Sequence, residues 1–569
     1  MAKPRIAVFS GPTATITNTP DLVTSNQART RHGLPLLTAP DGGPTRFDVL
    51  RAQRLAAPVT VYVEACSAHP LEADSNHLCA VPDGWLDDSG SFQSGTAPAG
   101  APPVYVVELR PEDGLYLLPY MARKADGSAW EEATAQPFAP IAASRQTFYP
   151  DASRLYEEID RFGLSDLGRP VELSSVADFD FIRAAPAGGY TQGLGAEART
   201  DAGEGDIPPE RLGEDFFVYY PYHLRHEPTL ATLARATNTV QTRLASGRYI
   251  GAQWLEGSPT AEETIYWLNL VVDTTVPIVG HAGQRRHQAL SCDGDRNIVD
   301  GIKYLTSGVA TDKDGRDRVG AVVIIDELVY SAREVAKVDA RPGGYEATGG
   351  HGGVVADMGG HGPPQLTYVP TRRHTYCSDV RLSVLPSEVT GVTGSLDEGV
   401  LAVPVATKRD DVNLESTAIP VVTISKYSEY SPPPTGPDAW SDPAVEVEIL
   451  ARISANLMNA PLAGFVCEGM SPFAIGSPTM NAALSVAVFA GMPVVRVGRG
   501  NTGGMARKTE PIFVAGNNLT ATKARVLLMA AILKLGALPP AADPRRPTEQ
   551  EHAATSRAVG RYQEIFDTH

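Results

Sequence analysis

The stretch RYIGAQWLEGSPTAEETIYWLNLVV, residues 248–272, decides the fold. Residues 248–255 are typical of a buried strand. The residues from Thr260 onward predict a helix, because Ile265, Leu268 and Val272 recur along one face at helical spacing. A buried strand that leads through a short turn into a helix is the repeating unit of α/β domains with a parallel sheet.

The same alternation continues on both sides of this unit. It predicts helices and strands in turn over 229–246, 276–283, 296–307 and 321–330, with the last segment, AVVIIDELVY, as one strand. A second set follows over 444–459, 464–469, 481–491, 492–498 and 522–536. The chain opens with one more strand, RIAVFS (5–10), which leads into a loop of small residues. We therefore expect two α/β sets.

Between the first strand and these sets the pattern changes. PVTVYVEA and PPVYVVEL are strand-like and are separated by loops rich in Gly, Pro and Ser, whereas helical patterns are few. We therefore predict a larger N-terminal domain with a parallel, flavodoxin-like sheet from residues 1–19 and 211–405. Residues 20–210 would be a β-rich insertion with a helical segment, and 406–569 a smaller C-terminal α/β domain.

Charge and composition exclude several classes of partner. The formal net charge of −17 over 569 residues argues against nucleic acid or an anionic membrane as the main partner. No apolar run is long enough to span a bilayer, and the N-terminus has no signal-peptide pattern. The five cysteines are scattered, which is typical of reduced thiols. We expect a cytoplasmic protein.

Ser258 has two interpretations. It is a favoured N-cap residue, Pro259 suits the first helical position, and Thr260 with Glu263 fits the spacing of a capping box. These local features favour a cap. The alternative is a chemical role at the carboxyl end of a strand.

Other hydroxyls and one lysine also follow strands. Thr13 and Thr15 come after the first strand, and Lys337 comes shortly after AVVIIDELVY. A Thr or Ser hydroxyl is a poor nucleophile unless a neighbouring group takes its proton, and a partly desolvated lysine can do that. Each of these residues also has an ordinary interpretation, as a turn hydroxyl, a helix cap or a surface ammonium.

Two groups of possible metal ligands are weak. CSAHPLEADSNHLC (66–79) contains Cys and His, but its spacing matches no common zinc pattern. His351 and His361 lie in a Gly-rich stretch that is typical of a surface loop. No dinucleotide or P-loop pattern stands between a strand and a helix. We expect no metal and no cofactor.

Several segments, in order, resemble the bacterial-type L-asparaginase/glutaminase family. SGPTATI stands where that family has Thr-Gly-Gly-Thr-Ile after its first strand, and EGSPTAEET where it has His-Gly-Thr-Asp-Thr-Met-Glu-Glu-Thr. Further matching segments are ALSCDGDRN (289–297), IDELVYSAREVAK (325–337), PTRRHT (370–375), MPVVRVGRGNTGG (492–504) and KARVLLMAAI (523–532).

The resemblance implies hydrolysis of an amide through a covalent acyl-enzyme. Thr15 takes the place of the family's nucleophile, or Thr13 if the turn is shifted by one residue. Ser258 takes the place of the second threonine, and Lys337 that of the lysine. Family members are usually homo-oligomers, so the resemblance also implies a homodimer or homotetramer.

The departures concern the substrate. Pro259 replaces the family's aspartate and Glu256 its preceding histidine, while Tyr222 and His223 stand near the family's carboxylate-binding pair. A proline side chain cannot compensate an ammonium, so asparagine would leave a charge unpaired. We therefore interpret Thr13, Tyr222, Glu256 and Pro259 as substrate-binding positions for another amide.

The functional hypothesis is an amidohydrolase that cleaves a linear or cyclic amide other than asparagine. Thr15, Ser258 and Lys337 are its catalytic candidates, and a small-molecule amide is its expected partner. Two alternatives stay open: a non-catalytic binding protein on the same scaffold, and a true L-asparaginase or glutaminase with a rebuilt pocket.

Overall fold

The structure is a computed structural model, and it describes only part of the chain. The described residues are 3–11, 59–64, 83–87, 92–99, 101, 103–109, 159, 165–166, 169–170, 173–183, 230–258, 260–285, 293–348, 352–359, 362–408, 413–427, 442–470, 473–499 and 510–569.

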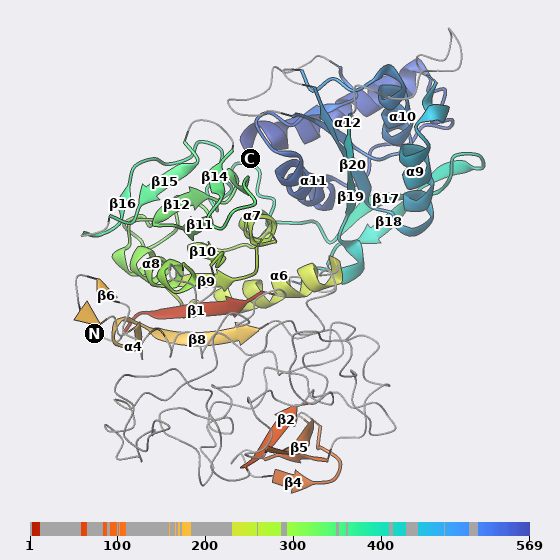
Figure 1. Cartoon of the computed structure of the whole chain (residues 1–569). Helices are drawn as coiled ribbons and strands as arrows, with labels where there is room; N and C mark the ends of the chain where they lie inside the picture. Colours follow the sequence, from red (N-terminus) through yellow and green to blue (C-terminus); the bar gives the residue numbers. More distant parts are fainter. Residues whose placement is uncertain are drawn as a thin grey trace, which may run out of the picture.

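A mixed sheet forms the N-terminal domain (Figure 1). Its strand order within the described residues is β16-β15-β12-β11-β10-β9-β1-β8. The strands from β8 to β11 are parallel, whereas β12, β15 and β16 extend one edge antiparallel. The bounds are β1 Arg5–Ser10, β8 Asp178–Arg183, β9 Gly251–Leu255, β10 Ile278–His281, β11 Val322–Ile325, β12 Leu328–Ser331, β15 Val354–Asp357 and β16 Gln365–Leu366. The predicted α/β class with a mostly parallel sheet is confirmed, with an antiparallel edge that the pattern did not predict.

Helices cover both faces of this sheet. Along β1, Ala7 and Phe9 belong to the same apolar cluster as residues of α6 and α7, whereas Ile6 and Val8 pack with residues of α8. The alternation follows from the period of two along a strand, which sends neighbouring side chains to opposite faces. The helices are α6 Leu230–Leu244, α7 Ala261–Val271 and α8 Gly294–Ser307.

The segment predicted as one strand over 321–330 is a hairpin. β11 and β12 pair antiparallel, and the turn between them is made by Asp326 and Glu327, both with positive φ (51° and 65°). Non-glycine residues seldom adopt this backbone region, so an apolar run without Gly or Asn concealed the turn. A second small hairpin follows, formed by β13 Val335–Lys337 and β14 Tyr345–Ala347.

The described parts of residues 20–210 are mostly strands. β2, β5, β3 and β4 form an antiparallel sheet, and β6 pairs with β7. β8 lies in the same range but joins the main sheet parallel to β1. The bounds are β2 Val59–Glu64, β3 Gly84–Leu86, β4 Phe92–Ser94, β5 Pro103–Leu109, β6 Ser165–Asp166, β7 Arg169–Pro170 and the short helix α4 Leu173–Val176. The predicted helical segment near 147–164 lies almost wholly outside the described residues.

The C-terminal domain has its own parallel sheet, in the order β19-β20-β21-β22. Helices predicted over 444–459, 481–491 and 522–536 are present as α9, α10 and α11, and α12 closes the domain without having been predicted. The hairpin of β17 Glu388–Ser395 and β18 Gly399–Ala406 packs on α9, although it lies almost wholly in the range predicted for the N-terminal domain. The other bounds are η4 Ser416–Ala418, β19 Val421–Lys426, η6 Pro443–Val445, α9 Val447–Asn459, β20 Ala463–Gly469, α10 Pro478–Phe489, β21 Val494–Gly498, β22 Val514–Ala515, α11 Ala521–Leu535 and α12 Glu549–Thr568.

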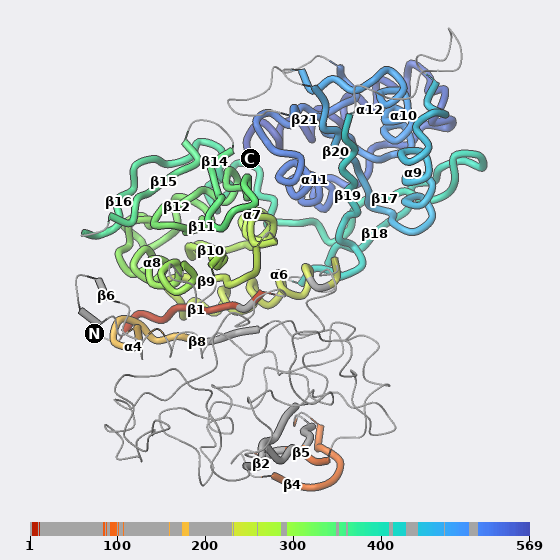
Figure 2. Tube along the Cα trace, viewed as in Figure 1, coloured from red at the N-terminus to blue at the C-terminus, as the bar shows by residue number. Residues whose placement is uncertain are grey.

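The two α/β domains meet where α11 packs on α7. Figure 2 shows α7 in yellow-green beside α11 in blue, although they are far apart in the sequence. The helix that leads out of the Ser258 turn is therefore also a domain contact.

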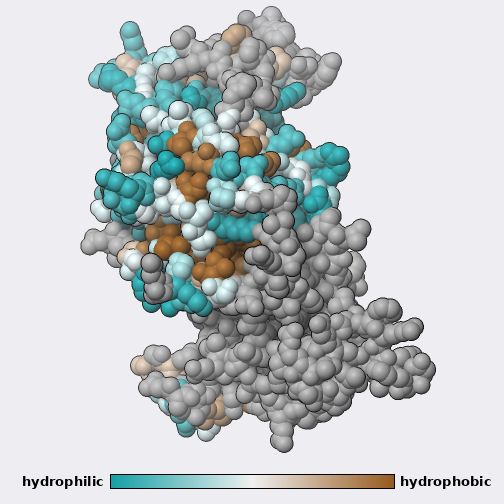
Figure 3. All heavy atoms as spheres, turned by 90° about the vertical axis from the view of Figure 1, so that its left-hand side faces the viewer, coloured by the Kyte–Doolittle hydropathy of each residue, from teal (hydrophilic) through white to brown (hydrophobic). Residues whose placement is uncertain are grey.

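On the coloured part of the face in Figure 3, apolar residues form small patches separated by polar ones.

Candidate functional site

The carboxyl ends of β1 and β9 lie side by side at one edge of the main sheet. Gly11, directly after β1, donates its N–H to the carbonyl of Leu255 at 2.7 Å. A Cβ on Gly11 would stand 2.9 Å from the Trp254 ring and 3.1 Å from the carboxyl carbon of Glu256, so only glycine fits this approach. Thr13 and Thr15 follow Gly11 in sequence, but both lie outside the described residues.

Ser258 lies in the turn that follows β9 and does not cap α7. The helix begins at Ala261, its N-cap residue is Thr260, and that residue makes no side-chain capping bond. The predicted cap at Ser258 and the predicted capping box are therefore both wrong. Both hydroxyls have other partners: the hydroxyl of Tyr345 donates a hydrogen bond to Ser258 Oγ at 2.7 Å, and the hydroxyl of Thr260 donates to the carbonyl of Gly257 at 2.9 Å.

Tyr345 comes from β14 and was not a predicted site residue. Its side chain is 4% exposed, and burial raises the pKa of its hydroxyl to about 12 although the bond to Ser258 lowers it. The hydroxyl therefore keeps its proton at neutral pH and acts as a donor. A hairpin signal was present in the sequence, because the RPGG turn brings the strands on either side of it into register.

Lys337 is directly opposite Tyr345 in the β13–β14 pair. Its ammonium lies 5.4 Å from the centre of the Tyr345 ring and donates a hydrogen bond to the carbonyl of Arg341 at 2.6 Å. Its backbone N–H donates to the carboxylate of Glu262, in the first turn of α7, at 2.5 Å. The structure thus connects Ser258 to Lys337 through Tyr345 and through α7.

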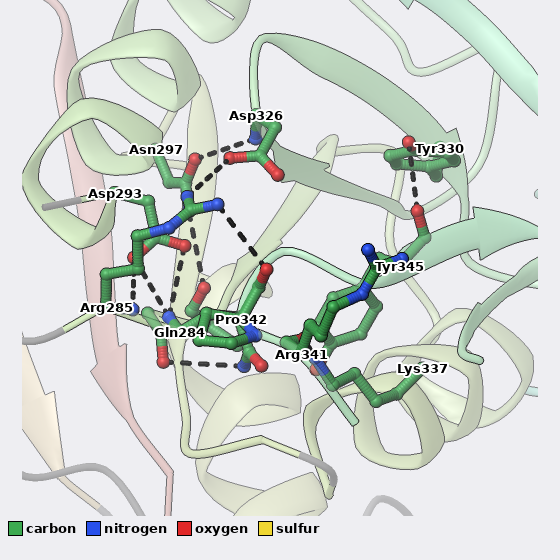
Figure 4. Close-up of polar contacts among 12 residues, drawn as sticks. Gln284, Arg285, Asp293, Asn297, Asp326, Tyr330, Lys337, Arg341, Pro342 and Tyr345 are labelled. Carbon is green, nitrogen blue, oxygen red and sulfur yellow. Dashed lines mark hydrogen bonds and ion pairs between the residues drawn. The ribbon is translucent and has the colours of Figure 1, made fainter. Parts of the chain in front are cut away.

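Figure 4 shows what holds the β13–β14 turn. The Arg285 guanidinium lies 3.5 Å from the Asp326 carboxylate in the β11–β12 turn and 3.4 Å from the Pro342 carbonyl, to which it donates. The backbone N–H of Arg285 in turn donates to Asp293, the N-cap residue of α8, at 2.7 Å. The turn between Lys337 and Tyr345 is therefore supported by the loops after β10 and β11.

Glu256 is buried at the junction of β1, β9 and α7, with 6% of its surface exposed. Burial raises the pKa of this carboxyl to about 7, while hydrogen bonds from the side chains of Trp254, Thr264 and Thr260 lower it. The Trp254 indole N–H donates to Glu256 Oε2 at 2.8 Å. A carboxyl group with this pKa is divided between its neutral and charged forms near pH 7.

The remaining predicted positions stay predictions. Tyr222 and Pro259, together with His223, lie outside the described residues, as do the 66–79 segment, His351 and His361. Within the described ranges, no group of three or more His, Cys, Asp or Glu residues is placed to hold a metal ion. No helix in those ranges is both long and apolar enough to cross a bilayer.

Residues 226–343, which contain the Ser258, Lys337 and Glu256 positions, match the family model described as Asparaginase, N-terminal. This region is therefore similar to the N-terminal domain of asparaginases. The sequence resemblance is thereby confirmed over this part of the chain, and the homology to bacterial glutaminase-asparaginases is distant.

Two named relatives and one solved structure are similar to parts of this chain. The glutaminase-asparaginase of Pseudomonas fluorescens biotype A is 31% identical over 132 residues, 23% of this chain and 34% of the relative. That of Acinetobacter glutaminasificans is 33% identical over 108 residues, 19% of this chain and 30% of the relative. The chain thus spans about a third of the length of these relatives. A probable cytoplasmic L-asparaginase from Campylobacter jejuni matches 60% of this chain and 81% of its own at a TM-score of 0.41 and 18% identity.

Proposed function

We propose that this protein is an amidohydrolase that cleaves the C–N bond of a linear or cyclic amide other than asparagine. The observation that carries the proposal is the hydrogen bond from Tyr345 to Ser258, with Lys337 across the strand pair from Tyr345, in a region similar to the N-terminal domain of asparaginases. It brings two hydroxyls and an ammonium together beside the carboxyl ends of β1 and β9, where parallel sheets place their chemistry.

The hydrogen-bond direction suggests the role of Ser258. Because Ser258 Oγ accepts from Tyr345, its own O–H can donate toward a substrate. In the proposed reaction, Thr15, or Thr13 if the turn is shifted, attacks the amide carbonyl. Its proton passes to Ser258 Oγ while the proton of Ser258 moves to the leaving nitrogen. The amine departs, and water then hydrolyses the acyl-enzyme by the reverse relay, which returns the threonine hydroxyl.

Tyr345 and Lys337 have supporting roles in this proposal. Tyr345 keeps its proton, because its pKa is raised, and orients Ser258 rather than acting as a base. Lys337 places a positive charge over the ring of Tyr345, where it favours the negative charge that develops on the hydroxyls during attack.

The surroundings of Glu256 support a substrate other than asparagine. Position 259 carries a proline. Glu256, three residues before it, is buried against Trp254 with its pKa raised, and Glu262, three residues after it, accepts the backbone N–H of Lys337. A carboxyl that is partly neutral compensates the α-ammonium of an amino acid poorly. We therefore propose an uncharged amide as the substrate. From the family resemblance we also propose a homo-oligomer, and from the sequence composition a cytoplasmic enzyme.

One observation favours a non-catalytic binding protein instead. The Lys337 ammonium donates to the backbone carbonyl of Arg341, so the lysine that the family resemblance assigns to catalysis is engaged in a structural bond. A third possibility is the activity named for the relatives, on glutamine or asparagine.

The deciding experiment is a screen for release of ammonia or amine from amides, lactams and hydrazides. Turnover that Thr15→Ala and Lys337→Met abolish supports the proposal. No turnover on any compound, with ligand binding intact, overturns the enzyme in favour of the binding protein. Rapid asparagine turnover overturns the substrate argument, and a covalent adduct on Ser258 overturns the assignment of Thr15 as nucleophile.

A further inference from the structure

We propose that Lys523, in the C-terminal domain, is a positioning residue for the site of the N-terminal domain. Its ammonium holds together the two segments that carry Ser258 and Lys337. The catalytic part of this inference rests on the proposed function, but the structural part does not.

The contacts of Lys523 cross from one domain to the other. Its ammonium donates to the carbonyl of Glu262 at 2.5 Å and to the carbonyl of Ala332 at 2.8 Å. Glu262 lies in the first turn of α7, four residues after Ser258, and Ala332 lies three residues before β13. One side chain of α11 is therefore bonded to both segments.

A third bond closes this arrangement. The Glu262 carboxylate accepts the backbone N–H of Lys337 at 2.5 Å. Burial raises the pKa of Glu262, whereas the positive charge of Lys523 and the bond from Lys337 lower it. The ammonium thus favours the ionised carboxylate that holds Lys337 in place.

Lys523 is deeply buried, and a charged group in such a position adds little to the stability of the fold. The side chain is 1% exposed, its ammonium lies 5.4 Å from the ring centre of Tyr266, and burial lowers its pKa to about 8. Burying a charge costs free energy that its partners roughly offset, so such a group contributes little net stability. What it does contribute is a fixed geometry between the segments that it joins.

A matched control, Arg525, lies two residues further along the same helix. Arg525 pairs with Glu263 across the same domain contact, but both side chains are about a third exposed, and neither bonds to the segment before β13. Exposed pairs of this kind contribute little. The bonds from Lys523 to Glu262 and Ala332, with the bond from Lys337 to Glu262, form what we call the clamp. Arg525→Met therefore removes a domain contact and leaves the clamp intact.

The test compares Lys523→Met with Arg525→Met by three measurements: hydrogen exchange of the Lys337 amide, the split between kcat and KM, and thermal unfolding. We expect Lys523→Met to accelerate exchange at Lys337 at least 10-fold and to lower kcat about 10-fold with KM changed less than 3-fold, because positioning acts on the reaction rather than on binding. Arg525→Met should leave the exchange rate, kcat and KM as in the wild type, and thermal unfolding checks that each variant is folded.

The outcomes separate the two proposals. Unchanged exchange at Lys337 in folded Lys523→Met overturns the clamp, whatever the activity. Faster exchange with unchanged kcat overturns the catalytic part alone. If the wild type turns over no compound of the amide screen, the proposed function fails while the exchange measurement still decides the clamp. Should Lys523→Met not fold, Lys523→Gln, which keeps an N–H donor without the charge, is measured in the same way.

Discussion

The tetrapeptide Gly-Ser-Pro-Thr occurs twice in this chain, at 257–260 before α7 and at 476–479 before α10. Before α10, Ser477 is a regular N-cap: its backbone is extended, its Oγ accepts the N–H of Met480 at 3.1 Å, and the helix begins at Pro478. Before α7, the helix begins at Ala261 and Ser258 Oγ accepts from Tyr345 instead.

The difference lies in what surrounds each serine. Ser477 accepts the backbone N–H of Met480 in its own helix and donates its hydroxyl to the carboxylate of Glu446. That carboxylate also accepts from Thr479 at 2.7 Å. Around Ser258 a donor arrives from β14, far along the chain. A hydroxyl taken out of its local role by tertiary structure is available for chemistry, whereas one engaged with its own helix is not.

The largest expected effect is on turnover. Ser258→Ala should reduce kcat/KM by about 10²–10⁴-fold, the usual contribution of a proton-transferring group, because the relay to the leaving nitrogen is broken. Ser477→Ala should leave kcat/KM unchanged. The measurement is steady-state kinetics on a substrate found in the amide screen. Equal losses in the two variants would contradict the distinction between the two serines.

Glu256, next to the first tetrapeptide, should make stability depend on pH. Its pKa is raised from 4.5 to about 7 on folding, so the folded state binds more protons in this window and the free energy of unfolding falls as pH rises through it. Across the whole of this pKa shift, the free energy of unfolding is expected to change by roughly 3 kcal/mol. Glu256→Gln, which resembles the neutral acid, should remove this slope. Urea unfolding measured at several pH values from 4.5 to 7 checks it, and a slope kept in the variant rules the assignment out.

The regular part of the fold was predictable because its signals are local. β9, α7, β10 and α8 lie where strand and helix periodicity placed them. The β11–β12 turn was missed because Asp326 and Glu327 take positive φ without the Gly or Asn that usually marks such a turn. The local pattern thus predicted the elements but not this change of direction.

The candidate site was less predictable, because its contacts join distant segments. Ser258 and Tyr345 are 87 residues apart, and Lys523 is 261 residues from Glu262. No motif marks Tyr345, and the family resemblance pointed to Ser258 and Lys337 but not to the hydroxyl between them. The wrong cap at Ser258 has the same origin, since local preference is overridden by a tertiary partner.

Tyr345→Phe removes the donor that distinguishes the two serines. A hydrogen bond of this kind contributes about 1 kcal/mol, so we expect kcat to fall roughly 5-fold as Ser258 loses its fixed orientation. The ring of the phenylalanine keeps the packing and the contact with Lys337. Kinetics and a near-UV spectrum of the folded variant test this. Full activity in Tyr345→Phe would mean that the bond to Ser258 has no part in the reaction.

The smallest effect concerns the cap itself. Ser477→Ala removes the side-chain acceptor for the Met480 N–H and should lower the free energy of unfolding by about 1 kcal/mol, the usual loss at an N-cap. In the Tyr345→Phe background, where the bond to Ser258 is already absent, Ser258→Ala should change it by less than about half as much, because Ser258 caps no helix. Urea titrations of the variants at one pH give the comparison. A larger loss for Ser258→Ala in that background than for Ser477→Ala would show that Ser258 stabilises the start of α7 after all, and would return its hydroxyl to a structural role.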